Sequence, residues 1–205
     1  MNQHSGSDKL PKTRRGRATR EKLLHAAEAE FGERGFAEAS IASITQRAGV
    51  ALGTFYVYFE SKEEIFRALV SYMGGLTRQW IVERVAESPD RLTAERRGVE
   101  AFIDFVREHR NLYRVVSMAQ FVAEDAFRDY YTVFADAYRE NLQRAVEGEE
   151  IRDGDCEVWS WALIGMTVFL GMRFADWDDK RSAEEIADAA ADLIGRGMAR
   201  PDRKG

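Results

Sequence analysis

The chain has 205 residues, 45% of them hydrophobic, which is enough to bury a core in one large domain or in two smaller ones. Three prolines and few alternating strand-like runs favour helices. The single cysteine, Cys156, excludes an internal disulfide and a multi-cysteine zinc site, and residues 1–17 lack the apolar segment of a signal peptide, so a reducing, cytoplasmic location is expected.

The net charge of −5 conceals an asymmetry along the chain. Residues 1–62 carry 10 of the 30 basic and 7 of the 35 acidic side chains, so this part is positive and residues 63–205 are negative. Seven of the bases lie between Lys9 and Lys22, with only one acid among them. Two interpretations stay open: a solvated tail that only aids solubility, or a basic arm for nucleic acid.

The first folded element is expected to begin near Thr19. Residues 1–18 are polar and basic and predict a flexible arm. Residues 20–34 then carry apolar side chains at helical spacing, with Thr19 placed to cap the start of the helix and Gly35 placed to end it in a left-handed conformation.

Two short helices are expected next, at residues 41–48 and 52–59, with Gly49 in the turn between them. Ser61 and Glu64 form an S-x-x-E pattern, which is typical of a helix N-terminus and predicts a longer helix after it. Four helices therefore fit into the first part of the chain.

Helical periodicity continues beyond residue 76 in longer units, with breaks expected near residues 88–89, 109–111, 148–154 and 176–181. The predicted fold class is therefore all-α, and the predicted domains are the arm at 1–18, a three-helix domain at 19–62 and a helical domain at 63–205.

The most apolar segment, residues 158–172, is about 15 residues long, which is shorter than the roughly 20 residues that span a bilayer. A buried helix is the preferred interpretation. No membrane partner is expected.

The pair of short helices with a glycine in the turn suits DNA binding, because a tight turn at positive φ lets the second helix enter a major groove. Such helix pairs also occur in proteins without a DNA role. Thr54, Tyr56, Tyr58 and Lys62 offer hydroxyl donors, aromatic faces and a cation, which suit contacts to phosphates and thymine methyl groups. The alternative is that the tyrosines are half-buried core residues.

For the two phenylalanines of this segment, Phe55 and Phe59, a core role is the preferred interpretation. They lie four residues apart, as two side chains on one face of a helix do.

The segment GTFYVYFESKEEIFRALV, preceded by SIASITQRAGV, resembles the signature of the TetR family of bacterial regulators, and the resemblance covers residues 19–70. It implies a helix-turn-helix that contacts operator DNA through Thr54, Tyr56, Tyr58 and Lys62, with Ser40 on a phosphate. Ala51 and Leu52 depart from the polar or basic pair that the family often has there, so backbone contacts, groove shape and the arm are expected to contribute. The predicted DNA-binding residues are Arg14, Arg15, Arg17, Arg20, Ser40, Gly53, Thr54, Tyr56, Val57, Tyr58 and Lys62.

The same resemblance implies that the C-terminal domain forms a homodimer through its last two long helices, at about 156–175 and 183–199. Small residues there allow close helix approach. Packing within one chain is the alternative. The predicted interface residues are Ala162, Gly165, Gly171, Ala189, Ala190 and Leu193.

The resemblance also implies a small-molecule inducer inside the C-terminal domain. Aromatic stripes at helical spacing are equally typical of a core, and basic residues there are equally typical of a solvated helix face. The segment REHRNLYRVVSMAQF is similar to regulators of this family that sense acyl-CoA thioesters, and a hydrophobic drug-like or aromatic inducer is the alternative. The predicted ligand-binding residues are Phe102, Phe105, Arg110, Arg114, Met118, Phe121, Phe127, Tyr131, Trp161 and Phe169.

The expected function is therefore that of a dimeric repressor, which binds a palindromic operator and is released by its inducer. Three histidines, the lack of a glycine-rich phosphate loop and the lack of an HExxH pair argue against an enzyme, so no catalytic residue, metal site or cofactor is expected. A helical ligand-binding or adaptor dimer without DNA binding is the rival, supported by the acidic total charge and by Ala51 and Leu52.

Overall fold

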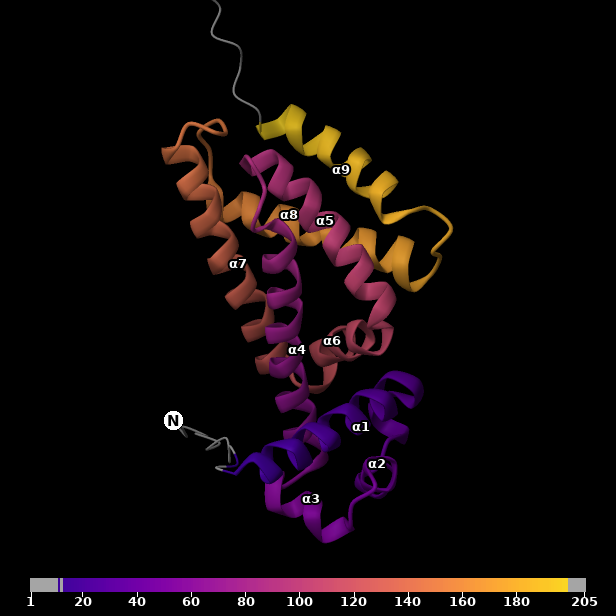
Figure 1. Ribbon diagram of the computed structural model, residues 1–205. Coiled ribbons are helices and arrows are strands. Elements are labelled where there is room, and N and C mark those ends of the chain that lie inside the picture. Colours follow the sequence, from indigo (N-terminus) through magenta and orange to yellow (C-terminus); the bar gives the residue numbers. More distant parts are fainter. Residues whose placement is uncertain (1–10, 12, 199–205) are drawn as a thin grey trace, which may run out of the picture. The chain divides into compact units, whose positions relative to one another are not determined.

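The structure is a computed structural model that describes residue 11 and residues 13–198. Within these residues the chain forms helices and no strands, which confirms the all-α prediction (Figure 1). The elements are α1 (Arg14–Glu38), α2 (Ile41–Ala48), α3 (Leu52–Tyr58), α4 (Lys62–Val85), α5 (Arg91–Glu108), α6 (Arg110–Val122), α7 (Glu124–Glu147), α8 (Cys156–Gly171), the π-helical turn η1 (Met172–Asp176) and α9 (Ala183–Met198).

Two compact units make up the chain, and each has its own core. Of the described residues, the first unit contains those up to 72 and 114–127, and the second contains 73–113 and those from 128 to 198. The divisions fall inside helices α4, α6 and α7. The units therefore differ from the predicted domains, because the first also takes in the start of α4 and most of α6.

Helix α1 begins earlier than the sequence predicts. Thr13 caps it, since its hydroxyl accepts a hydrogen bond from the Gly16 N–H at 3.1 Å. Residues 14–18, predicted to belong to a flexible arm, are therefore helical, while residues 1–10 and 12 of that arm lie outside the described residues. A kink follows at Gly35, whose φ of 79° and ψ of 166° belong to a region that only glycine adopts readily.

The core of the first unit is built from apolar faces of α1 to α4. Phe31 of α1 meets Phe66 of α4 edge to face, with ring centroids 5.2 Å apart, and Phe36 meets the same ring at 5.2 Å. Phe55 and Phe59 are buried, which confirms the core role predicted for them. Further core residues are Leu23, Leu24, Ile44, Ile65, Leu69 and Val70.

The core of the second unit lies where α5 packs against α9 and α8 (Figure 1). Val99, Phe102 and Ile103 of α5 meet Ile186 and Ala187 of α9 in one buried cluster. A second buried cluster joins α7, α8 and α9. Ser182 and Glu185 form a capping box before α9, because the Ser182 hydroxyl accepts from the Glu185 N–H while the Glu185 carboxylate accepts from the Ser182 N–H, both at 3.1 Å.

The apolar segment near residue 165 has the predicted extent as a helix but is less buried than the sequence predicts. Helix α8 continues through η1, and Cys156–Asp176 is a 21-residue helix that is long and apolar enough to cross a membrane by length and composition alone. Core helices of soluble proteins pass the same test. Only 22% of its apolar window is buried, so the prediction of a buried helix was wrong here, because one face of the helix stays exposed.

Candidate DNA-binding surface and ligand pocket

The turn between α2 and α3 has the predicted geometry. Ser40 caps α2 in a reciprocal pair of hydrogen bonds with Ser43. Gly49 ends α2 in the left-handed region, with φ 67° and ψ 35°, and its N–H and that of Val50 donate to carbonyls of the last turn. A side chain at residue 49 would be strained in this conformation, so the glycine fixes the angle between the two helices.

Helix α3 has one buried face and one exposed face. Phe55 and Phe59 point into the core, while Tyr56 is 52% and Val57 is 63% exposed. Tyr58 is partly exposed, and its hydroxyl lies near Gly16 in the first turn of α1. The predicted alternative of core tyrosines therefore does not apply to Tyr56, because its ring faces solvent.

Arginines gather on the first turns of α1. Arg14, Arg15 and Arg17 are exposed. Arg20 is partly buried, with its guanidinium 5.3 Å from the centre of the Phe59 ring. Arg20 therefore helps to join α1 to the end of α3 through a cation–π contact.

Lys62, at the first residue of α4, has partners within the protein. Its ammonium donates to the carbonyls of Phe36 at 2.8 Å and Ala39 at 2.9 Å, and it lies 4.4 Å from the centre of the Phe36 ring. These carbonyls belong to the C-terminal end of α1. Lys62 therefore ties that end to α4, a role that the sequence did not predict because the partners are 23 or more residues away.

A buried carboxylate joins α1 to α2. Glu30 is 3% exposed and accepts a hydrogen bond from Arg47 at 2.8 Å, and Arg47 also holds Glu33 at 2.9 Å. The hydrogen bond from Arg47 lowers the pKa of Glu33 below its usual range. This network was missed in the sequence, where the three residues look like ordinary surface charges.

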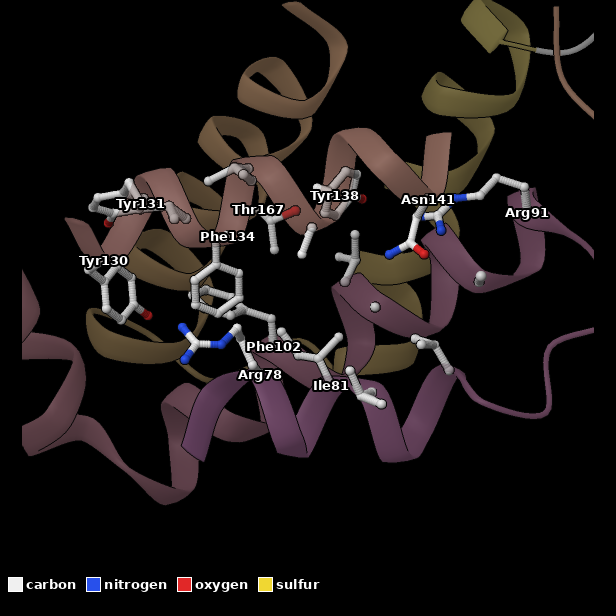
Figure 2. A pocket seen from close by; sticks show the side chains of 18 residues that line it. Arg78, Ile81, Arg91, Phe102, Tyr130, Tyr131, Phe134, Tyr138, Asn141 and Thr167 are labelled. Atoms are coloured by element: carbon white, nitrogen blue, oxygen red, sulfur yellow. The ribbon is translucent and has the colours of Figure 1, made fainter. Parts of the chain in front are cut away.

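The second unit contains a cavity of about 160 Å³ between four helices (Figure 2). Its walls are mostly apolar and come from α4, α5, α7 and α8, with Ile81, Phe102 and Phe134 among them. Arg78 lies at one end and Arg91 at the other (Figure 2). The chemistry suits an apolar body with polar groups at its ends.

Two of the predicted ligand-binding residues, Phe102 and Tyr131, line this cavity. Phe105 is instead part of a cluster with Trp80 and His109, with ring centroids 5.8 and 4.7 Å away. Arg110 pairs with Asp179 at 2.6 Å. The other predicted residues do not line it: Arg114, Met118, Phe121 and Phe127 belong to the first unit, and Trp161 and Phe169 are exposed.

The sequence missed the contribution of α4 to the cavity. One face of this helix carries Arg78, with Ile81 and Val82 three and four residues after it. All three follow residue 70, where the resemblance to the TetR family ends. The signal that the sequence offered for this part of the cavity was a basic residue, Arg78, on an otherwise apolar face of α4.

Comparison with known proteins identifies the family. The family model for bacterial regulatory proteins, tetR family, matches residues 23–69. YdgC of Bacillus subtilis (strain 168), an HTH-type transcriptional regulator, is 30% identical over 185 residues, which cover 88% of this chain and 93% of YdgC. The chain belongs to the TetR family of bacterial transcriptional regulators. Residues 23–69 hold the helix-turn-helix described above.

Solved structures confirm the TetR fold over most of the chain. FadR of Bacillus subtilis, in complex with stearoyl-CoA, has a TM-score of 0.74 at 19% identity and covers 85% of this chain and 96% of its own. AibR, in complex with isovaleryl coenzyme A and operator DNA, has a TM-score of 0.69 at 17% identity and covers 85% of this chain and 97% of its own.

In this TetR-family chain the small residues of α8 and α9 divide between two faces. Gly171 and Ala190 face the core, since a Cβ at residue 171 would lie 2.7 Å from the Phe102 ring and Ala190 is buried against α5. Their prediction as interface residues was therefore wrong, because they let α5 approach closely. The exposed residues of the two helices include the predicted Ala162, Ala189 and Leu193 and the unpredicted Val158, Trp161 and Phe169, while the predicted Gly165 is partly exposed.

Proposed function

We propose that this TetR-family regulator is a homodimeric repressor, which binds a palindromic operator through α2 and α3 and is released by a small, largely hydrophobic inducer. The observation that carries the proposal is the division of α3: two buried phenylalanines fix the helix, while Tyr56 faces solvent and Thr54 and Tyr58 are partly exposed. A surface of this kind is suited to a major groove.

In this proposal Thr54, Tyr56 and Tyr58 make the contacts to bases and phosphates, with Gly53 and Val57 close to the DNA. Ser40 adds a phosphate contact at the N-terminus of α2, where backbone N–H groups favour an anion. Arg14, Arg15, Arg17 and Arg20 hold the backbone from the start of α1. Lys62 would contact a phosphate either alongside its present hydrogen bonds to the carbonyls of Phe36 and Ala39 or in exchange for one of them.

The dimer is proposed to form through the exposed apolar face of α8 and α9. Trp161, Phe169 and Leu193 are 46%, 66% and 66% exposed in the single chain, and a monomer would leave this area in water. A two-fold dimer through this face would present two recognition helices about one DNA turn apart, or a multiple of it, and this spacing requires a palindromic operator.

The inducer is proposed to occupy the cavity of the second unit. FadR binds stearoyl-CoA and AibR binds isovaleryl coenzyme A, so acyl-CoA thioesters are the first class to examine. Helix α4 carries Lys62 at its first residue and pocket residues 78–85 near its end. A ligand that binds one position of α4 better than another can therefore shift the spacing of the recognition helices.

The first experiment is selection of duplex DNA from a randomised pool by the purified protein, followed by sequencing. A palindrome with half-sites about one helical turn apart, bound by a dimer in sedimentation, is the expected result. No enrichment even at low salt would overturn DNA binding and would favour a helical adaptor dimer.

The salt dependence of operator affinity tests the role of the α1 arginines. Replacing Arg14, Arg15 and Arg17 by glutamine keeps helix α1 while removing three charges. The dimer loses six charges, and because each lost phosphate contact reduces the slope of log affinity against log salt by about 0.9, we expect the slope to fall by about 5. Replacing Arg139 and Arg144 of α7 by glutamine is the matched control. An unchanged slope in the α1 variant would contradict the proposed phosphate contacts of the α1 arginines.

A further inference from the structure

The two ends of the cavity differ in charge. At one end Arg91 donates to the Glu95 carboxylate at 2.6 Å, and the Tyr138 hydroxyl donates to the same carboxylate. Burial raises the pKa of Tyr138 well above its usual value, and the charge of Glu95 raises it further, so the hydroxyl stays protonated. The Arg91 charge is therefore already neutralised within the protein.

Arg78, at the other end, has no such partner. Among the described residues, no carboxylate lies within ion-pair distance of its guanidinium, which instead lies 5.6 Å from the centre of the Phe134 ring. Figure 2 shows it beside Tyr130 and Phe134, on the wall of the cavity. A guanidinium over an aromatic face keeps its N–H groups, which lie in its own plane, available for an anion.

The backbone makes room for this arrangement. A Cβ at Gly74, one turn before Arg78, would lie 3.1 Å from the guanidinium and 3.2 Å from the Tyr130 ring. Glycine at this position therefore lets the guanidinium lie beside Tyr130. Burial raises the pKa of Tyr130, so its hydroxyl is neutral and can donate to the same anion.

From this geometry we infer that the inducer carries an anionic group bound by Arg78, with Tyr130 beside it, and an apolar body of about benzene's size that fills the cavity. The size follows from the cavity volume of about 160 Å³, because engineered apolar cavities of about 150 Å³ hold benzene. The inference rests on the proposed function, which supplies the ligand site, and it adds the charge and size of the ligand. The anion is either the carboxylate of a small acid or a phosphate of a short-chain coenzyme A thioester.

Two matched pairs of probes test the inference by isothermal titration calorimetry on the full-length protein. Phenylacetate and phenylacetamide differ by the negative charge on a similar aromatic body. Isovaleryl coenzyme A and isovaleryl pantetheine share the thioester and differ by the nucleotide and its phosphates. We expect the anionic member of at least one pair to bind about tenfold or more tightly than its partner, because a charge-assisted Arg–anion contact is among the stronger polar interactions.

Two variants test whether Arg78 causes the difference in affinity between the anionic probe and its neutral partner. Arg78→Gln is expected to abolish the preference for the anion, and Arg78→Lys is expected to keep part of it. Arg84→Gln is the matched control, because Arg84 lies on the same helix, is stacked on Trp80 and does not line the cavity. Thermal unfolding of each variant checks that it is folded.

A preference in the first pair identifies a carboxylate, and one confined to the second identifies a phosphate; both support the inference. Equal affinity within both pairs, no binding by any probe, or an equal effect of Arg78→Gln and Arg84→Gln would overturn it. Operator binding without probe is measured in parallel. If the operator is bound while the anion preference is missing, only the inference fails; if no operator is bound, the proposed function fails.

Discussion

Replacement of Glu95 by leucine is expected to lower the free energy of unfolding by about 3 kcal/mol or more. Glu95 is 1% exposed and is held by Arg91 and by the Tyr138 hydroxyl. Without the carboxylate, the largely buried Arg91 guanidinium has lost its counter-charge and Tyr138 has lost its acceptor. Urea denaturation followed by circular dichroism measures the loss, at one fixed protein concentration because a dimer couples stability to concentration.

The variant that replaces all three polar groups provides the control. Arg91→Met, Glu95→Leu and Tyr138→Phe together remove the ion pair and its hydroxyl donor while keeping apolar volume, so the triple variant should regain most of the stability that Glu95→Leu loses. If Glu95→Leu alone were as stable as the unmodified protein, the cluster would not be a coupled buried network.

Replacement of Lys62 by methionine is expected to lower the free energy of unfolding by about 2 kcal/mol. The ammonium donates to the carbonyls of Phe36 and Ala39 at the end of α1, and it also lies over the Phe36 ring. Methionine keeps much of the apolar side chain and removes the donor, which leaves these carbonyls without their charged partner. The same urea denaturation measures the change.

Arg67→Met on the same helix is the matched control. Its exposed ion pair with Asp125, at 3.0 Å, should contribute less than about 1 kcal/mol. If Lys62→Met left stability unchanged and reduced only operator affinity, the role of Lys62 in joining α1 to α4 would be contradicted, and a direct DNA contact would be supported.

The local structure of the helix-turn-helix could be predicted because it depends on nearest neighbours in sequence. Gly49 was recognised as the turn residue, and helix α2 has the predicted bounds. The S-x-x-E pattern at Ser61 was only half right. Its hydroxyl accepts from the Glu64 N–H at 3.1 Å, but the Glu64 carboxylate accepts from the Glu60 N–H instead.

Features that depend on packing across the chain could not be predicted in the same way. Gly171 and Ala190 looked like interface residues because small residues suit both a dimer and a tight internal contact, and only their position against α5 decides between the two. The break between α6 and α7 was also missed. Ala123 lies there without a glycine or proline to mark the end of a helix.

The cavity illustrates the same limit. Tyr131 and Phe102 were found through their aromatic character, but Arg78 was not, because a basic residue on a long helix usually faces solvent. Its significance appears only when the apolar neighbours from α7 and the position of the guanidinium over the Phe134 ring are seen together.

DNA reading by α3 is tested most directly by the affinity of a selected operator duplex, measured by fluorescence anisotropy, for the unmodified protein and for a Tyr56→Phe, Tyr58→Phe variant. Phenylalanine keeps the rings and removes only the two hydroxyls. The dimer loses four hydroxyls in all, and at about 0.5 to 1 kcal/mol per hydrogen bond we expect a loss of roughly 30- to 1000-fold with unchanged thermal stability. Equal affinity of the two proteins for the duplex would contradict the assignment of α3 as the surface that reads DNA.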